Sequence, residues 1–313
     1  MLEKILVPLD GSPTAEAVLP HVGRLLRRVD AEVILLQSAN PIPSADTYVP
    51  VAEAALAAAR EYLLGIQQRL EGRGVKVRII TRLGSAADVI AEVARQEGVG
   101  AVAIATHGRS GVARLLLGSV AEHVLRTSPV PVLAVRPFWS YELAQPVRVE
   151  DAPVRNILVP LDGTLAILPE AARFARFFGA RVVLLHVVDP NLGLTPRVRA
   201  GQGLADVAER FADTDLAKAE LAEQAAWFRN EGVEVTTIVD VGNPARVIVD
   251  SCRFHEIDLI AMATHGRTGL SRLVMGSVTE SVLRESKVPL VVVRSGHAAP
   301  KEGDKVSAAK EGH

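Results

Sequence analysis

Two aspartates stand at matched places in the chain, each directly after a short apolar run. They lie in the segments Pro-Leu-Asp-Gly-Ser and Pro-Leu-Asp-Gly-Thr, at residues 8–12 and 160–164. A carboxylate at the end of a strand can accept hydrogen bonds from the hydroxyls of a ribose. The same segments also predict a turn, in which Ser12 or Thr164 caps the next helix and Pro13 takes its first position. Because Asp10 and Asp162 are less needed for that turn, a ribose-binding role stays open for them.

A second pair of matched segments has the composition of a phosphate-binding loop. Ala-Thr-His-Gly begins at Ala105 and again at Ala263, and nine residues separate each copy from a Gly-Ser pair. Glycine lets the backbone approach a ligand without a Cβ in the way. Arginines, which bind phosphates well, recur in both loops at positions 109 and 114 and at positions 267 and 272. For one such loop alone, a glycine-rich turn with solvated arginines would be favoured, but two copies with the same spacing favour phosphate binding.

The two Gly-Ser pairs also stand where a helix is expected to begin. Each is the start of a Ser-x-x-Glu segment, at Ser119 and at Ser277, and this pattern is typical of a capping box. A helix N-terminus offers unpaired N–H groups and a positive dipole, both of which attract phosphate. We therefore expect a phosphate near Gly118 in the first copy and near Gly276 in the second.

Other residues that could do chemistry give weaker signals. The second predicted strand ends at Ser38 in one copy and at Val187 in the other. Because these residues differ, we expect the backbone there, rather than a side chain, to meet an adenine edge. His107 and His265 each lie beside a glycine, where packing or capping is favoured over a ligand role. No metal-ligand spacing and no Ser-His-Asp set is visible, and Cys252 is expected to be inert core.

The apolar pattern predicts the scaffold that would hold these segments. Residues 33–36 and 182–185 are continuous apolar runs, as expected for strands covered on both faces. The predicted strands are residues 3–9, 32–38, 75–81, 101–105 and 131–135, then 155–161, 181–188, 233–239, 257–263 and 289–293. The predicted helices are residues 13–28, 50–72, 85–97 and 119–127, then 165–178, 203–230, 243–254 and 277–285. This alternation implies right-handed crossovers and a doubly wound parallel α/β sheet in each copy.

The chain repeats itself once, in order and with nearly constant spacing. Residues 4–12 return as 156–164, residues 106–111 as 264–269, and residues 115–126 as 273–284. A period this long indicates a duplicated domain rather than a solenoid. The predicted domains are residues 1–137 and 155–294, with a linker at residues 138–154. Residues 295–313 hold almost nothing to bury, so we expect them to form a disordered tail.

Composition excludes several classes of protein. Of the 313 residues, 49% are hydrophobic and 23% are charged, which is typical of a globular protein and not of a disordered chain. The formal charge is −1, so no basic excess favours binding to nucleic acid. No apolar run is long enough to span a membrane, and residues 1–12 lack the pattern of a signal peptide. Together with the single cysteine, these features predict a cytoplasmic protein with no membrane partner.

Both halves resemble the universal stress protein family, over nearly all of the first 294 residues. The resemblance rests on the Val-Pro-Leu-Asp-Gly segments, on THGRSG and THGRTG, on LLLGSVAEHVLR and LVMGSVTESVLR, and on the closing VPVLAVR and VPLVVVR. ATP-binding members of that family carry Gly-x-x-Gly, nine residues, and then Gly-Ser or Gly-Thr. Here the spacing, the last glycine and the serine match, but Ala105 and Ala263 replace the first glycine. Each adds a Cβ that could crowd a nucleotide.

The resemblance implies two tandem Rossmann-like domains of the adenine nucleotide alpha hydrolase-like type, each a five-stranded parallel sheet with helices on both faces. It also implies that residues 131–135 and 289–293 pair within the chain as a pseudo-dimer, and a homodimer of chains stays open. ATP, with or without Mg²⁺, is the implied ligand. The implied contacts are Pro8, Leu9, Asp10, Ser38, Gly108, Arg109, Gly118, Ser119 and Val120, then Pro160, Leu161, Asp162, Val187, Gly266, Arg267, Gly276, Ser277 and Val278.

Three functions are compatible with these residues. The favoured one is a regulatory, stress-linked ATP sensor with two ATP sites, one in each half, that has no catalytic residues and little or no turnover. The second is a nucleotide-free scaffold or dimerisation module, in which the two alanines exclude ATP. The third is a slow ATP hydrolase. A dehydrogenase is disfavoured because Asp-Gly-Ser or Asp-Gly-Thr, rather than a Gly-x-Gly-x-x-Gly loop, follows each first strand.

Overall fold

The computed structural model describes most of both halves of the chain. The described residues are 2–26, 31–40, 48–106, 117–137, 139–140, 145–146, 153–162, 165–189, 204–264 and 275–294. Predictions that concern residues 107–116, 265–274 and 295–313 therefore lie outside the described residues, as does most of the predicted linker. No helix in the described part is long and apolar enough to cross a membrane.

The first half alternates strands and helices as the sequence predicts. Its elements are β1 (Lys4–Pro8), α1 (Pro13–Glu16), α2 (Leu19–Leu26), β2 (Glu32–Ala39), α3 (Tyr48–Glu71), β3 (Lys76–Leu83), α4 (Ala86–Gln96), β4 (Ala101–Ala105), α5 (Ser119–Thr127) and β5 (Val132–Val135). A two-residue strand, β6 (Trp139–Ser140), then pairs antiparallel with β7 (Gln145–Pro146). All five strands predicted for this half are confirmed to within two residues at each end.

The second half repeats the order of strands. Its elements are β8 (Asn156–Leu161), α6 (Leu168–Phe178), β9 (Arg181–Val188), α7 (Leu204–Asn230), β10 (Val235–Val241), α8 (Pro244–Phe254), β11 (Leu259–Ala263), α9 (Ser277–Glu285) and β12 (Leu290–Val293). The five strands predicted here are also confirmed, again to within two residues at each end.

The first helix of each half differs from its prediction. The predicted helix at 13–28 is two helices, because Ala17 and Val18 form a turn between α1 and α2. Pro20 explains the break, since a proline ring clashes with the helical carbonyl four residues earlier and is tolerated only in a first turn. In the same way α6 begins at Leu168 rather than at residue 165, with Pro169 in its first turn. Both helices thus start just before a proline.

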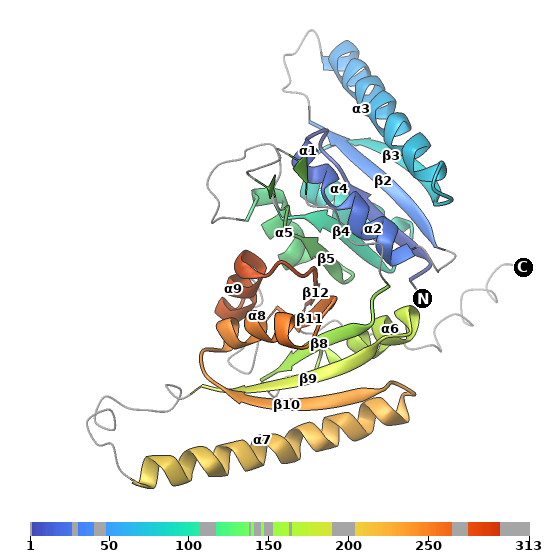
Figure 1. The fold of residues 1–313 in the computed structure, drawn as a ribbon. Coiled ribbons are helices and arrows are strands. Elements are labelled where there is room, and N and C mark those ends of the chain that lie inside the picture. Colours follow the sequence, from blue (N-terminus) through green and yellow to red (C-terminus); the bar gives the residue numbers. More distant parts are fainter. Residues whose placement is uncertain are drawn as a thin grey trace, which may run out of the picture.

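The ten long strands form a single sheet that runs through both halves (Figure 1). The strand order is β10-β9-β8-β11-β12-β5-β4-β1-β2-β3, and every pair is parallel except β12 with β5. At that antiparallel junction Val291 lies opposite Leu133. The predicted pairing of the two last strands is therefore confirmed, and each half contributes a five-stranded parallel sheet.

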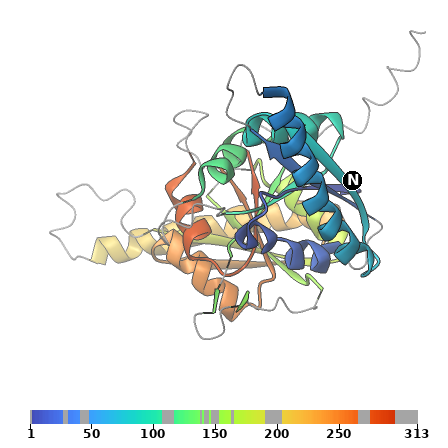
Figure 2. The same cartoon turned by 90° about the horizontal axis from the view of Figure 1, so that it is seen from above.

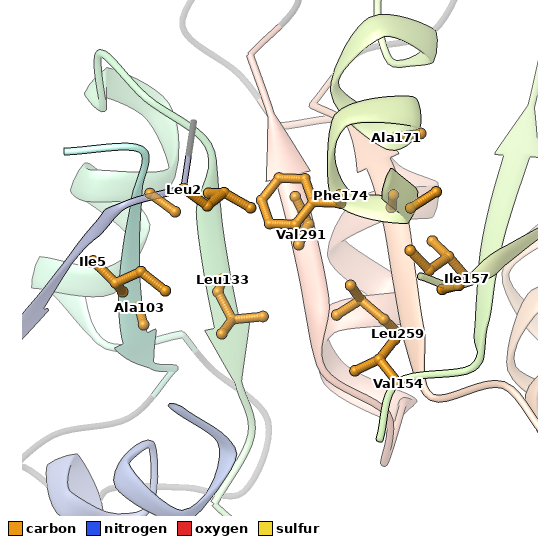
Figure 3. Close-up of a cluster of buried hydrophobic side chains, with 14 of the residues drawn as sticks. Leu2, Ile5, Ala103, Leu133, Val154, Ile157, Ala171, Phe174, Leu259 and Val291 are labelled. Atoms are coloured by element: carbon orange, nitrogen blue, oxygen red, sulfur yellow. The ribbon is translucent and has the colours of Figure 1, made fainter. Parts of the chain in front are cut away.

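Helices cover both faces of the sheet, and each face has its own apolar core. Along β2 the side chains alternate, so that Val33 and Leu35 face one core and Ile34 and Leu36 face the other. The first core lies under α1, α2, α3, α6 and α7, and the second lies under α4, α5, α8 and α9. The first core continues across the junction of the halves, as Figure 3 shows for the side chains around Phe174 and Leu133. The long helices α3 (blue) and α7 (yellow) lie at opposite ends of the molecule in Figure 1, so that in Figure 2, seen from above, α3 is in front and α7 is behind.

Two arginines tie the halves together at equivalent places. Arg24 in α2 donates to the carboxylate of Asp258, just before β11, at 2.5 Å. Arg173 in α6 is the equivalent of Arg24 in α2. Each arginine stands four residues after the proline of a matching segment, Ala-Val-Leu-Pro in the first half and Ala-Ile-Leu-Pro in the second. Arg173 donates across the junction to the backbone oxygen of Gly100, just before β4, at 3.1 Å. Helix α2 of the first half therefore contacts the start of the fourth strand of the second half, β11. Helix α6 of the second half contacts the start of the fourth strand of the first half, β4.

Candidate functional site

The carboxyl ends of the strands place most of the predicted site residues in one region. In the first half β1 lies between β2 and β4, and the chain runs from β1 toward β2 on one side and returns as β4 on the other. This is a topological switch point, where doubly wound sheets leave a crevice for a ligand. Pro8, Ser38 and Ala105 lie at or near the ends of these three strands.

A pocket occupies this crevice. Its volume is about 290 Å³, close to the lower end of the range of small-molecule sites, about 300–1,000 Å³. Strands β1, β2 and β4 and helices α1, α4 and α5 all contribute to the wall, which is mostly apolar. The lining residues are Pro8, Leu9, Asp10, Ala15, Leu36, Ser38, Ala86, Ile90, Ile104, Ala105, Gly118, Ser119, Val120 and Ala121.

The turn after β1 is held by two side chains. The Asp10 carboxylate accepts a hydrogen bond from the backbone N–H of Ser12 at 2.9 Å, and the Ser12 hydroxyl accepts one from the N–H of Ala15 at 3.1 Å. The predicted cap at Ser12 and the predicted place of Pro13 at the start of the helix are therefore confirmed. The expectation that Asp10 is less needed for the turn is wrong, because an aspartate readily forms this local bond to the backbone. Asp10 both shapes the turn and lines the pocket.

Helix α3 braces the wall that α1 forms. The Tyr62 hydroxyl donates to Glu16 at 3.0 Å, and Arg69 donates to the other carboxylate oxygen of Glu16 at 2.7 Å. Burial, together with the negative charge of Glu16, raises the pKa of Tyr62 well above its usual value, so this hydroxyl keeps its proton and remains a donor. Glu16 is the last residue of α1, and Ala15 beside it lines the pocket.

Helix α5 begins at the other wall of the pocket, but not as the capping box predicts. The cap residue is Gly118, whose backbone is extended and which has no capping side chain. Ser119 is instead the first helical residue, exposed and lining the pocket. The N–H of Gly118 donates to the carbonyl of Thr106 at 2.8 Å, so the two ends of the loop at 107–117 are joined. The capping-box prediction is wrong because the glycine starts the helix one residue earlier and Ser119 then faces the crevice.

The second half repeats this arrangement at α9. Gly276 is the cap residue, again without a capping side chain, and Ser277 is the first helical residue. The Gly276 N–H donates to the Thr264 carbonyl at 2.7 Å. The capping-box prediction is thus wrong in both halves for the same reason.

Helix α4 contributes two lining residues that the sequence analysis missed. Ala86 and Ile90 lie in the pocket wall. Gly84, two residues before α4, has a φ of +132°, and a Cβ there would lie 3.1 Å from Val89. Gly242 has the same place before α8, with a φ of +156°. The missed signal is a glycine followed by a capping residue at matched places, Gly-Ser and Gly-Asn, directly after the third strand of each half.

Most of the predicted contacts lie where the resemblance implies. In the first half Pro8, Leu9, Asp10, Ser38, Gly118, Ser119 and Val120 all line the pocket. In the second half Pro160, Leu161, Asp162, Val187, Gly276, Ser277 and Val278 lie at the equivalent ends of β8 and β9 and at the start of α9. Gly108, Arg109, Gly266 and Arg267 lie outside the described residues, as do His107, Arg114, Thr164, His265 and Arg272. Whether any of these residues binds a nucleotide stays a prediction.

The alanines that replace the family's first glycine lie in ordinary strand backbone. Ala105 ends β4 and pairs with Val135, and Ala263 ends β11 and pairs with Val293. An extended strand is a conformation that any residue adopts, so neither position requires glycine for its backbone. Ala105 is itself part of the pocket wall, and its Cβ is the smallest that a side chain can add.

Cys252 lies in the core, and the titratable residues of the described part form no cluster of metal ligands. Cys252 is buried and donates to the carbonyl of Ile248 at 3.2 Å, and burial raises its pKa to about 12. The prediction that it is core is confirmed. Among the described residues no three His, Cys, Asp or Glu side chains gather in a way that could hold a metal ion. The expected absence of a metal site stays a prediction.

The fold and the site define the class of the protein: two Rossmann-like α/β domains in tandem, with a pocket at the switch point of the first. The family model of the universal stress protein family matches residues 1–136 and 153–294. The chain is 33% identical over 146 residues to a universal stress protein of Methanocaldococcus jannaschii, a match that covers 45% of this chain and 82% of that protein. It is 25% identical over 312 residues to one of Mycolicibacterium smegmatis, covering 93% and 96% of the two chains.

A solved structure shows the same arrangement over nearly the whole chain. A universal stress protein from Archaeoglobus fulgidus superimposes with a TM-score of 0.66 and 23% identity, over 95% of this chain and all of that one. This likeness concerns the fold. Because the family model matches both halves, the chain belongs to the universal stress protein family, as a tandem member.

Proposed function

We propose that the pocket of the first half binds an adenine nucleotide, ATP, and that the protein acts in the stress response as a regulator controlled by this ligand. The observation that carries the proposal is the place of the pocket. It lies at the switch point of a doubly wound sheet, and seven of the contacts implied by the family resemblance line it.

The chemistry of the wall suits the parts of a nucleotide. Leu36, Ile90 and Ile104 offer apolar surface for the faces of a base. The Asp10 carboxylate has acceptor capacity beyond its bond to Ser12, and a ribose offers hydroxyl donors. The start of α5 at Gly118 offers backbone N–H groups and the positive end of the helix dipole, which favour phosphate. In this proposal the base and the ribose fill the pocket, and the phosphates lie at the start of α5.

Neither Ala105 nor the Mg²⁺ that accompanies ATP argues against this ligand. Ala105 needs no unusual backbone, and its methyl group adds to the apolar wall rather than blocking the crevice. Mg²⁺ accompanying the nucleotide is coordinated mainly by phosphate oxygens and water, as is usual for this ion, so the site needs no protein cage. We further propose that the ligand is held with little or no turnover, and that the protein acts in the cytoplasm, where a single cysteine stays reduced.

Titration calorimetry of the full chain with ATP tests the proposal. We expect saturable binding at ATP concentrations up to about 1 mM, equivalent to a binding free energy of about −4 kcal/mol or better. Gly118→Trp, which fills the pocket wall at α5, should abolish that binding. The matched control is Gly65→Trp on the exposed surface of α3, where a Cβ has nothing within 4 Å and binding should be unchanged.

Two results would contradict the proposal. A chain that gives no saturable binding at about 1 mM ATP, and whose melting temperature ATP does not raise, is a nucleotide-free scaffold instead. Sustained ATP hydrolysis at more than about 1 per second, the low end for ordinary enzymes, would make it an ATP hydrolase. Slower hydrolysis is compatible with a regulatory ligand.

A further inference from the structure

The two halves offer matched positions at which their sites can be compared residue by residue. Pro8 lies opposite Leu36 in the sheet, and Pro160 lies opposite Leu185, so Ser38 and Val187 are equivalent. The strand registers likewise match Ile104 with Met262. The Gly-Ser pairs that begin α5 and α9 match Ala121 with Thr279.

One wall of the first pocket has no counterpart among the described residues of the second half. Between Asp10 and the start of α2 lie residues 11–18, which include α1. Between Asp162 and the start of α6 lie only residues 163–167, and those that are described, 165–167, form no helix. The connection in the second half is thus three residues shorter, and its described residues provide no counterpart to the turn of helix whose Ala15 lines the first pocket. In agreement, Asp10 is half-buried whereas Asp162 is exposed.

The opposite wall carries a different bond. Thr279 is buried at 4% exposure, and its hydroxyl donates to the carbonyl of Ala263 at 3.0 Å. The equivalent residue in the first half, Ala121, lines the pocket and has no hydroxyl. Thr279 thus adds side-chain atoms between α9 and the end of β11, where the first half keeps open space. Met262 in place of Ile104 adds a longer side chain beside it.

Two further differences remove polar groups from the second site. Val187 replaces Ser38 and so has no hydroxyl for a ligand. Pro244 replaces Ala86 at the first position of the helix after the third strand. Proline has no N–H, so a backbone donor at the rim is lost as well.

From these differences we infer that the two sites are not equivalent: the chain binds one nucleotide, in the first half, and the second half serves as its structural partner without a nucleotide of its own. This inference rests on the proposed function, because it concerns the same ligand. The second half keeps the Gly-Ser helix start at Gly276 but lacks the α1 wall, the serine hydroxyl and the open space beside α9.

Binding stoichiometry and a matched pair of variants test the inference. Titration calorimetry of the full chain with ATP should give one site per chain. Ala86→Trp should weaken binding about tenfold or more, because the indole enters the pocket from its rim. Pro244→Trp introduces the same side chain at the equivalent place of the second half, and it should leave the stoichiometry and the affinity unchanged. Both positions are half-buried at a helix start, and thermal melting of each variant checks that the fold is kept.

The outcomes separate this inference from the proposed function. One site per chain that Ala86→Trp weakens and Pro244→Trp does not supports both. Two sites per chain, or a loss of binding in Pro244→Trp, would overturn the inference and leave the proposed function intact. A chain that binds no ATP overturns the proposed function, and the inference with it.

Discussion

The two halves of the molecule are most alike where they meet and least alike where the ligand is proposed to bind. At the junction both contribute a four-residue apolar strand, β5 or β12, and both send an arginine, Arg24 or Arg173, across to the other half. At the carboxyl ends of the strands, among the described residues, the first half has α1 without a counterpart in the second, and the second has the Thr279 bond without a counterpart in the first. The comparison teaches that the sheet and the site are under separate physical constraints. A shared core demands matching surfaces, whereas a ligand demands only one good pocket.

The largest expected effect concerns the shared core. Phe174 in α6 is 4% exposed and lies at the junction of the halves beside Leu2 and Val291 (Figure 3). Phe174→Ala should lower the free energy of unfolding by about 3–5 kcal/mol, because it leaves a cavity in a core that both halves use. Chemical denaturation measures the loss. Phe254→Ala, at a position 78% exposed, is the control and should change stability by less than about 0.5 kcal/mol. Equal losses in both variants would argue against a shared core.

The second prediction concerns the arginine that crosses from the first half. Arg24→Ala removes the ion pair with Asp258, whose other oxygen accepts from the backbone N–H groups of Arg155 and Asn156. Since both side chains are mostly buried, we expect a loss of about 1.5–3 kcal/mol in the same denaturation experiment. Arg246→Ala breaks an exposed pair with Asp250 and should cost less than about 0.5 kcal/mol. If Arg24→Ala costs no more than Arg246→Ala, the crossing pair does not hold the halves together.

A smaller effect on stability is expected from the residue that stands three positions before Arg24 or Arg173, the two arginines that reach across the junction. The second half has Glu170 near Arg173, whereas the first half has His21 at the place equivalent to Glu170. Burial, with the nearby charge of Arg24, lowers the pKa of His21 to about 4. The unfolded chain takes up this proton near pH 6.5, so the free energy of unfolding should fall by about 1–2 kcal/mol between pH 7 and pH 5.

Denaturation at both pH values measures this pH dependence. His21→Gln should remove that part of the slope, because glutamine does not titrate. The exposed His255 is the control, and His255→Gln should leave the slope as it is. A slope that His21→Gln does not reduce would assign the pH dependence to other groups.

The smallest expected effect on stability is at the helix caps, and it separates the two sites. Ser12→Ala removes the cap of α1, and Asn243→Ala removes the equivalent type of cap at α8, whose side chain accepts from Arg246 at 3.1 Å. Each should cost about 1 kcal/mol of stability. Only Ser12→Ala should also weaken ATP binding, because α1 is a wall of the pocket. Equal effects of the two variants on ATP affinity, measured by calorimetry, would contradict the difference between the halves.

The strands and the pairing of the halves could be predicted from the sequence because their signals are local or repeated. Continuous apolar runs such as residues 33–36 leave little choice for a strand buried on both faces. The breaks in helices were harder to predict. Pro20 and Pro169 decide where α2 and α6 begin, yet each lies inside an otherwise helical pattern. In the sequence alone, the helical periodicity of residues 13–28 is a stronger signal than one proline, so it predicts a single continuous helix.

The site could be predicted only where side chains carry its signal. Asp10 and Ser119 were identified by type and spacing, and both line the pocket. Ala86 and Ile90 were missed because small and apolar residues in a helix are typical of a core, and only the turn at Gly84 brings them to the crevice. Ser119 lies at the predicted place, but the prediction that it caps the helix was wrong, since the choice of cap residue depends on the backbone of Gly118.

The antiparallel pairing of β5 with β12 has a consequence for how the molecule can vary. In a homodimer both subunits come from one sequence, so any change in one site appears in the other. Here the two partners are covalently joined, their ratio is fixed at one to one, and their contact does not weaken on dilution. Each half can therefore carry a site of its own design while the seam between them stays the same.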